Sequence, residues 1–258
     1  MPGVRDRVAL VTGAGSPDGI GFATAKLLKE SGAKVAITST TNRIFDRLAE
    51  LGGNSNNTFA FSADLTTPAA VIELVKEVSN ALGPVDIVVN NAGMVQVGVD
   101  EPSTPLHVTS DENWEYGINI NLTSAFRVTR AVLPSMIERG YGRIVNVSSV
   151  TGPLVSIPGS GVYGAAKAGL VGMTKSIAIE TGAHNITANC IGPGWIKTGS
   201  SSESEVIAGR YTPIGRPGTP SEVGHVAVFL ASEEASYVTG QLLVVDGGNT
   251  IQEYKVEL

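Results

Sequence analysis

Short hydrophobic segments alternate along the chain with longer segments in which apolar residues recur every three or four positions. The short segments are rich in β-branched residues and lack polar alternation, which is typical of strands covered on both faces of a sheet. They are Val8–Thr12, Lys34–Ser39, Thr58–Ser62, Val85–Val89, Arg143–Val147, Ile186–Ile191 and Leu242–Val245. The longer segments have helical spacing and are Ile20–Ser31, Arg43–Leu51, Pro68–Leu82, Asn113–Arg139, Tyr163–Thr181 and Pro220–Ala231. Strands that alternate with helices predict an α/β fold in which a doubly wound, seven-stranded parallel sheet is flanked by helices.

Composition and charge describe a globular protein. Of the 258 residues, 42% are hydrophobic and 16% are charged, and no repeat or linker-like segment interrupts them, so we expect residues 1–258 to form a single domain. The net charge of −6 disfavours nucleic-acid binding. A single cysteine, Cys190, excludes a disulfide within the chain. Because no apolar segment approaches 18 residues and the N-terminus lacks a signal peptide, we expect no membrane association and a cytoplasmic location.

Two irregular regions, Met94–Glu112 and Thr198–Arg216, each follow a predicted strand and are rich in Ser, Thr, Pro and Gly. Ligands of open α/β sheets bind outside the carboxyl ends of the strands. We therefore expect both regions to cover a binding site. Trp114 and Trp195 flank the two regions, where each would be either a substrate wall or a core residue.

The first predicted strand runs into a glycine-rich turn. It reads Thr12-Gly13-Ala14-Gly15-Ser16-Pro17-Asp18-Gly19-Ile20-Gly21, and a predicted helix follows. Glycines let the backbone approach a pyrophosphate, whose charge then faces the helix N-terminus. Such a turn also fits a purely structural role, but its place between the first strand and its helix favours dinucleotide binding.

This turn resembles the T-G-x-x-x-G-x-G turn of the short-chain dehydrogenase/reductase superfamily, and the resemblance extends over Arg5–Gly248. It implies a Rossmann-like, NAD(P)-binding catalytic domain. The cofactor residues that it implies in the turn are Gly13, Gly15, Asp18, Gly19 and Ile20. Because five residues rather than three separate Gly13 from Gly19, we expect Pro17-Asp18 to bulge outward.

The end of the second strand distinguishes NADP from NAD. An acidic residue there would accept hydrogen bonds from the ribose 2′-hydroxyl and repel a 2′-phosphate, but the chain reads Ser39-Thr40-Thr41-Asn42-Arg43. The hydroxyls, with Arg43 nearby, could hold a phosphate by hydrogen bonds and charge, which favours NADP(H). NAD(H) stays the alternative for two reasons. The hydroxyls could instead cap the next helix beside a solvated Arg43, and Asp18 stands where many NADP-preferring relatives carry a basic residue.

The resemblance extends to three more segments around the cofactor. Asp64-Leu65 corresponds to a step beside the adenine ring, although on the residues alone Asp64 also fits a helix cap. Asn90-Asn91-Ala92-Gly93 matches the family's N-N-A-G and implies that this segment lines the cofactor and braces the sheet. The turn at Pro193-Gly194 would pass the nicotinamide carboxamide, which Ile196 and Thr198 would bind.

A tyrosine and a lysine lie one helical turn apart in Tyr163-Gly164-Ala165-Ala166-Lys167. An ammonium near a phenol lowers the phenol pKa from about 10 and makes it a general acid usable near neutral pH. The pair alone is common in amphipathic helices. With Ser149 after the fifth strand and Asn121 in an earlier helix, it resembles the family's catalytic constellation, which implies Asn121, Ser149, Tyr163 and Lys167 rather than the neighbours Ser148 and Asn119.

The resemblance implies hydride transfer between a nicotinamide cofactor and a ketone or secondary alcohol. Tyr163 would be the general acid/base, Ser149 a second hydrogen-bond donor, and Lys167 also a ligand of the cofactor ribose, while Asn121 would hold a water. We therefore predict an NADP(H)-dependent reductase. The alternatives are an NAD-dependent secondary-alcohol dehydrogenase that works oxidatively and a non-catalytic dinucleotide-binding redox sensor.

The substrate is less constrained than the chemistry. The 3-oxoacyl carrier-protein reductases are the nearest generic likeness, but docking a carrier needs a basic patch, and the candidates Arg127 and Arg130 occur singly on a helix. The family also implies a homotetramer formed through Ala227–Val245. No histidine spacing indicates a metal site. We expect a small-molecule carbonyl or alcohol substrate, no metal and an inert Cys190 in the core.

Overall fold

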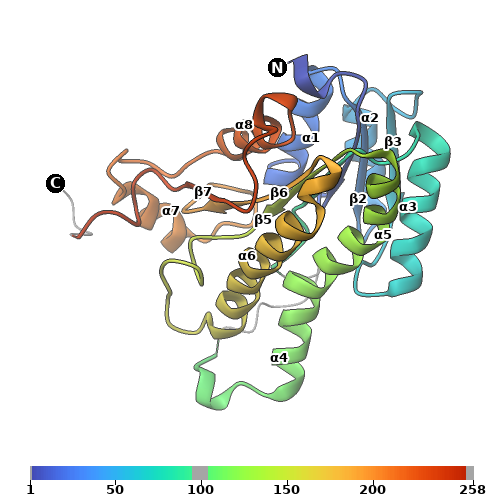
Figure 1. Cartoon of the computed structure of the whole chain (residues 1–258). Coiled ribbons are helices and arrows are strands. Elements are labelled where there is room, and N and C mark those ends of the chain that lie inside the picture. Colours follow the sequence, from blue (N-terminus) through green and yellow to red (C-terminus); the bar gives the residue numbers. More distant parts are fainter. Residues whose placement is uncertain (1, 95–103, 254–258) are drawn as a thin grey trace.

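The computed structural model describes residues 2–94 and 104–253, and in them the predicted sheet is confirmed. Seven parallel strands follow the order β3-β2-β1-β4-β5-β6-β7 (Figure 1). The strands are β1 (Val8–Thr12), β2 (Lys34–Ser39), β3 (Thr58–Ser62), β4 (Ile87–Asn90), β5 (Gly142–Val147), β6 (Ile186–Pro193) and β7 (Leu242–Val245). The strands β1, β2, β4, β5 and β6 are buried along nearly their whole length, because helices cover both faces of the sheet, whereas the edge strands β3 and β7 are partly exposed.

The strand order reverses beside β1, which pairs with β2 on one side and with β4 on the other. Val11 is in register with Ile37 of β2 and with Val89 of β4. At such a switch point the loops after the two neighbouring strands diverge to opposite faces and leave a crevice. The loops after β1 and β4 are the glycine-rich turn and the segment Asn91–Met94.

Helices form the two outer layers. One face of the sheet packs against α1 (Ile20–Glu30), α2 (Arg43–Glu50) and α8 (Pro220–Leu230), and the other against α3 (Pro68–Leu82), α5 (Ser124–Arg139) and α6 (Gly161–Thr181). Two hydrophobic clusters fill these layers. The first is centred on Phe22, Leu28 and Ile44, and the second on Leu74, Met136 and Ile144. Burial of this apolar area is the main contribution to the stability of the fold.

The predicted helix Asn113–Arg139 is wrong as a single element. The structure has α4 (Asp111–Ile118), a π-helical turn (Asn119–Thr123) and then α5. A π-turn inserts one extra residue into the helical ladder and often marks a functional site. Here it carries Asn121, whose side chain is buried. The other predicted ends differ from the structure by no more than two residues.

The second irregular region is also partly helical, which corrects the sequence prediction. Within Thr198–Arg216 the structure has α7 (Glu203–Arg210), which begins with a capping box formed by Ser202 and Glu205. In the first irregular region a short 3₁₀ turn covers Leu106–Val108, and residues 95–103 lie outside the described residues.

Candidate active site

A cleft of about 1220 Å³ opens at the carboxyl ends of the strands and gathers most of the residues singled out in the sequence. The predicted cofactor residues that line it are Gly13, Gly15, Asp18, Gly19, Ile20, Ser39, Thr40, Arg43, Asp64, Leu65, Asn91, Ala92, Gly93, Pro193, Gly194, Ile196 and Thr198. Ser149, Tyr163 and Lys167 line the same cleft. Of the predicted catalytic and cofactor residues, Asn121 does not line the cleft, and neither does Thr41, which follows the second strand.

The glycine-rich turn is held against the loop after β4 by backbone contacts. Gly13 has a φ of +67°, and a Cβ on it would lie 2.7 Å from the Ala92 Cα. The Asn91 amide Nδ2 donates to the carbonyl oxygens of Thr12 and Gly13, at 3.1 and 3.0 Å. Only glycine fits at position 13, because the two loops touch at their main chains.

The N-terminus of α1 faces this turn without a side-chain cap. The N-cap residue is Gly19, and no side chain caps the helix by a hydrogen bond. Pro17 and Asp18 are exposed at the rim, where Gly199 of the opposite loop lies close to Ser16 and Asp18. Bare backbone N–H groups at a helix start attract an anion, so the turn fits the pyrophosphate of a dinucleotide.

Arg43 lies over the glycine turn. A Cβ on Gly15 would be 2.7 Å from Arg43 Nε and 2.9 Å from Ser39 Oγ, so the side chains of β2 and α2 contact the turn here. Ser39 Oγ donates to the Thr41 carbonyl oxygen at 3.0 Å. This end of the cleft therefore offers a guanidinium and hydroxyl groups, and in the described residues no acid stands at the end of β2.

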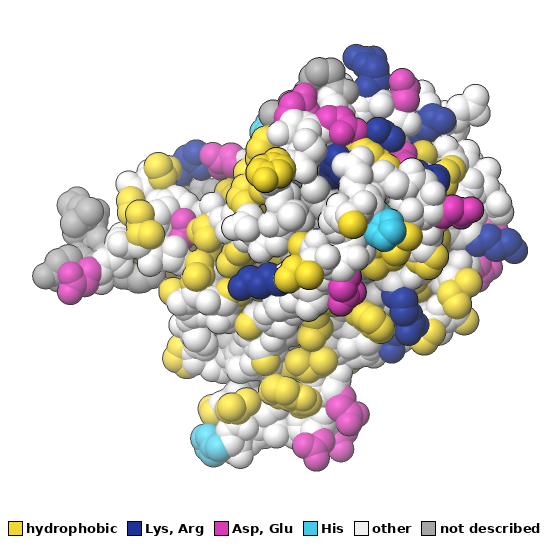
Figure 2. All heavy atoms as spheres, in the orientation of Figure 1, with side chains coloured by type: hydrophobic (Ala, Val, Ile, Leu, Met, Phe, Trp, Pro, Cys, Tyr) yellow, Lys and Arg dark blue, Asp and Glu magenta, His cyan; other side chains and the backbone are white. Residues whose placement is uncertain are grey.

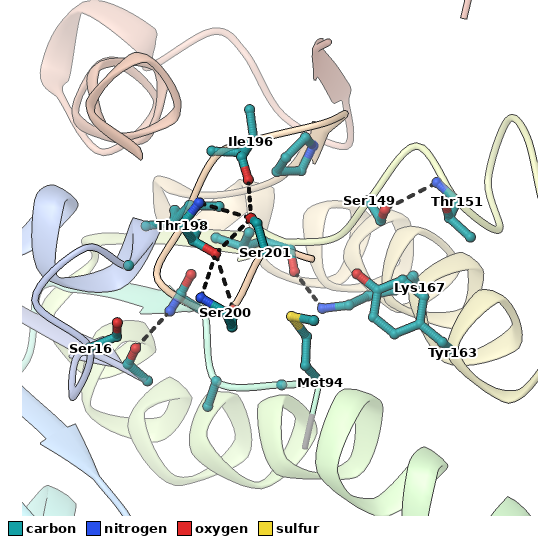
Figure 3. Close-up of a pocket in the computed structure, with 18 of the residues that line it drawn as sticks. Ser16, Met94, Ser149, Thr151, Tyr163, Lys167, Ile196, Thr198, Ser200 and Ser201 are labelled. Carbon is teal, nitrogen blue, oxygen red and sulfur yellow. Dashed lines mark hydrogen bonds between the residues drawn. The ribbon is translucent and has the colours of Figure 1, made fainter. Parts of the chain in front are cut away.

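Ser149, Tyr163 and Lys167 reach the cleft from the end of β5 and from α6 (Figure 3). Lys167 is only 4% exposed, its ammonium donates to the Val147 carbonyl oxygen at 2.9 Å, and its Nζ lies 5.5 Å from the centre of the Tyr163 ring. Ser148 points away, because its hydroxyl donates to the Lys167 carbonyl oxygen at 2.8 Å. Ser149 is therefore the serine of this pair that faces Tyr163 in the cleft.

The Asn121 side chain contacts the backbone of the loop after β4. Its Oδ1 accepts from the Met94 N–H at 2.7 Å, and its Nδ2 donates to the Met94 and Gly117 carbonyl oxygens at 3.2 and 3.1 Å. Met94 has a φ of +65°, which is strained for a residue with a side chain. A Cβ on Gly93 would be 2.9 Å from Asn121 Oδ1 and 3.3 Å from Lys167 Nζ, so Gly93 separates the two groups.

Asn90 was expected to line the cofactor, but the structure places it elsewhere. It does not line the cleft; its Nδ2 donates to Thr129 Oγ1 and Asn146 Oδ1, at 3.0 and 2.8 Å. Asn146 Nδ2 in turn donates to Thr174 Oγ1 on α6 at 2.8 Å. This buried chain of polar groups ties β4 and β5 to the two helices, so Asn90 braces the sheet and α6.

Several lining residues escaped the sequence analysis. They come from the loop after β5, from α7 and from the C-terminal segment, and include Val155, Ser156, Ile157, Ser160, Glu205, Ala208, Tyr211 and Asn249. The spacing Ser202-x-x-Glu205 is the signal that would have found α7. Trp195 also lines the cleft, whereas Trp114 does not.

The C-terminal segment is fastened to the end of α7. The Asp246 carboxylate accepts from the N–H groups of Gly248 and Thr250, at 2.9 and 2.7 Å. Gln252 Nε2 donates to the Tyr211 carbonyl oxygen at 2.7 Å. Asn249 sits inside this turn and is 5% exposed, so part of the tail that the sequence left without a role forms a wall of the cleft.

The remaining candidate groups lie away from the cleft. Burial raises the pKa of the Cys190 thiol to about 11, as expected for an inert core residue. All three histidines are exposed, and the described residues hold no cluster of three or more metal-ligating side chains. Among those residues, no helix is both long and apolar enough to span a bilayer.

The fold and the cleft together define a dinucleotide-binding oxidoreductase. A family model described as enoyl-(acyl carrier protein) reductase matches residues 13–250. Among curated relatives, the oxidoreductase UcpA of Salmonella typhimurium is 37% identical over 98% of both chains. The 3-oxoacyl-[acyl-carrier-protein] reductase FabG of Vibrio cholerae is 39% identical over 95% of this chain and 98% of its own.

A solved structure agrees with these relatives. A crystal structure assigned as a gluconate dehydrogenase of Agrobacterium tumefaciens superposes with a TM-score of 0.85, at 33% identity over 96% of this chain and 98% of that one. The chain belongs to the short-chain dehydrogenase/reductase superfamily. It is therefore an oxidoreductase that acts on CH–OH or ketone groups, and its family binds NAD(P).

Proposed function

We propose that the protein is an NADP(H)-dependent reductase of small-molecule ketones, formed by residues 1–258 as one catalytic domain, with Tyr163 as the proton donor. The observation that carries this proposal is that Ser149, Tyr163 and Lys167 share one cleft with the glycine turn and Arg43. A purely regulatory dinucleotide site would have no use for a buried lysine beside a tyrosine in the same cleft.

The residues of the cleft fit the cofactor from end to end. Arg43, Ser39 and Thr40 would hold the 2′-phosphate, and the glycine turn with the N-terminus of α1 would hold the pyrophosphate. The other contacts would come from Asp18, Ile20, Asp64, Leu65, Asn91, Ala92, Gly93, Pro193, Gly194, Ile196 and Thr198. When bound, NADPH would supply the hydride that reduces the carbonyl carbon.

The chain's own residues would stabilise and protonate the carbonyl oxygen. The Tyr163 hydroxyl would donate its proton to that oxygen, and the Ser149 hydroxyl would donate a second hydrogen bond to it. The Lys167 ammonium, held by the Val147 carbonyl oxygen at 2.9 Å, would keep a positive charge beside the phenol and bind the cofactor ribose. Asn121 would act as a positioning residue that holds Gly93 and Met94 beside Lys167.

The two candidate docking arginines already have partners within the chain, which favours small ketones over carrier-bound substrates. Arg127 already donates to the carbonyl oxygen of Thr66 and to Asn119 Oδ1, at 2.6 and 2.8 Å. Arg130 stacks on Phe126, with 4.9 Å between the guanidinium carbon and the ring centre. On the face shown in Figure 2, basic side chains are scattered among acidic and apolar ones, and acidic side chains gather over α4. The predicted cytoplasmic location and homotetramer remain expectations from the sequence.

Calorimetric titration with NADPH and with NADH tests the cofactor assignment. Arg43→Ala removes a charge-assisted contact to the 2′-phosphate, so we expect the Kd for NADPH to rise roughly 10- to 100-fold and the Kd for NADH to stay the same. Lys26→Ala is the matched control, because it removes one positive charge from an exposed site on α1 outside the cleft. Tighter binding of NADH by the unmodified protein, or an equal effect of both substitutions, would contradict the assignment.

A further inference from the structure

Nine of the lining residues that have no part in the cofactor assignment form what we call the substrate wall: Val155, Ser156, Ile157, Ser160, Trp195, Glu205, Ala208, Tyr211 and Asn249. They come from the loop after β5, from the loop after β6, from α7 and its C-terminal end, and from the C-terminal segment. Because they line the cleft and are not needed for the proposed cofactor contacts, we infer that their chemistry decides which ketones can enter.

Positive charge in the described lining of the cleft is confined to the cofactor and catalytic residues. Arg43 lies against Gly15 at the glycine turn. Lys167 is 4% exposed, and its ammonium donates to a main-chain carbonyl oxygen. The substrate wall contains neither Lys nor Arg.

The nearby cations outside the described lining are turned to other partners or to solvent. Arg216, which follows α7, pairs with Glu222 through two hydrogen bonds of 2.7 and 3.0 Å. Lys197 and Arg210 are exposed and do not line the cleft. A carboxylate or phosphate on the substrate would therefore lack a counter-charge in this wall.

The one charged member of the substrate wall is acidic. Glu205 lies in the first turn of α7, where its Oε2 accepts from the backbone N–H and the hydroxyl of Ser202, at 2.7 and 3.0 Å. These bonds fix the carboxylate at the cleft. The helix is itself anchored, because Gly209 packs against Pro217 and the Tyr211 carbonyl oxygen accepts from Gln252.

The rest of the wall is neutral. The hydroxyls of Ser156, Ser160 and Tyr211 and the buried amide of Asn249 can exchange hydrogen bonds with an uncharged polar group. The remaining members are apolar or aromatic. Such a lining binds uncharged ligands well, since each of its polar groups finds a partner without an unpaired charge being buried.

We propose that the site takes uncharged ketones and rejects ketones that carry a carboxylate or phosphate near the carbonyl, with Glu205 as the residue that determines this selection. The inference rests on the ketone reduction proposed above. A like-charged pair several ångströms apart, at the effective dielectric constant of a partly buried site, repels strongly enough to reduce binding by about 100-fold.

Matched pairs of keto-esters and keto-acids test this proposal: ethyl pyruvate with pyruvate, ethyl acetoacetate with acetoacetate, and ethyl benzoylformate with benzoylformate. With saturating NADPH, we expect kcat/KM for the ester to exceed that for the acid by about 100-fold. In Glu205→Gln the ratio should fall by about the same 100-fold, because loss of the carboxylate raises the activity on the acid far more than that on the ester. Gln preserves the capping box, so α7 should remain folded.

Glu203→Gln is the control, because Glu203 lies on the same helix and is exposed outside the cleft, so that its substitution changes the net charge equally. We expect it to leave the ratio unchanged. Equal reduction of ester and acid by the unmodified protein would overturn this inference while the proposed function stands. An equal effect of both glutamate substitutions would overturn the role of Glu205. Reduction of no member of any pair by a protein that binds NADPH would overturn the proposed function together with this inference.

Discussion

The Asn121 side chain joins the π-turn before α5 to the loop after β4, and substitution of this residue tests what the contact contributes. Its side chain is 3% exposed and forms three hydrogen bonds to backbone groups of Met94 and Gly117. Asn121→Ala removes all three and frees a residue that is held at a φ of +65°. We therefore expect both the stability of the fold and the turnover rate to fall.

The magnitude follows from these contacts. Three hydrogen bonds, each contributing about 0.5–1.5 kcal/mol net, are lost from a buried site. Relaxation of the strained Met94 backbone returns about 1 kcal/mol. The free energy of unfolding should fall by about 2 kcal/mol. Because Gly93 separates Asn121 from Lys167, a shift of this loop should lower kcat about 10- to 100-fold.

Urea denaturation and steady-state kinetics measure the two effects. Asn119→Ala is the matched control, since Asn119 lies in the same π-turn but its Oδ1 accepts from Arg127 outside the cleft, at 2.8 Å. It should cost about 1 kcal/mol of stability and leave kcat unchanged. If Asn121→Ala loses stability but keeps the kcat of the unmodified protein, the reasoning about the positioning role is refuted.

Three further predictions concern other parts of the molecule. Arg143→Met should lower the unfolding free energy in urea by about 3 kcal/mol, because three main-chain carbonyl oxygens lose the fully buried guanidinium that donates to them. A loss below about 1 kcal/mol would contradict its structural role. Burial raises the Cys190 pKa from 9.0 to about 11, so the contribution of the neutral thiol to the unfolding free energy should be complete below pH 9 and be lost as the pH rises through 11. Cys190→Ala should flatten that decline in urea titrations repeated at each pH. Gly13→Ala and Gly53→Ala both force alanine into a positive φ, but only a Cβ at position 13 meets neighbouring main chain. Gly53→Ala should therefore cost about 1 kcal/mol, whereas Gly13→Ala should cost more because of the main-chain clash and should also lose NADPH binding in fluorescence titrations.

The elements that sequence reasoning located well are those fixed by local patterns. The strands are short, mostly apolar runs, so β1, β2, β3 and β7 begin and end where the pattern predicts. The glycine turn and the Tyr163–Lys167 pair are equally local, since each depends on the order of residues within one turn. Both can therefore be recognised without knowing which distant parts of the chain are in contact.

The features that were missed depend on contacts between distant parts of the chain. The π-turn exists where Asn121 bonds to Met94, 27 residues away, which no helical periodicity reveals. Asn249 reaches the cleft because its turn packs on the loop after α7, where the Ile214 N–H donates to the Gly247 carbonyl oxygen. The helix α7 itself was obscured by the high content of Ser and Gly around it, although its capping box was present in the sequence.

The central claim is that Tyr163 donates the proton in a cleft that holds NADPH, and Tyr163→Phe tests it most directly. The variant keeps the ring and loses the hydroxyl, so NADPH affinity, measured by the quenching of protein fluorescence, should stay within about threefold of the unmodified protein. Single-turnover reduction of ethyl benzoylformate by bound NADPH should slow by about 10²–10⁴-fold. Turnover at the unmodified rate, with cofactor affinity intact, would contradict the account.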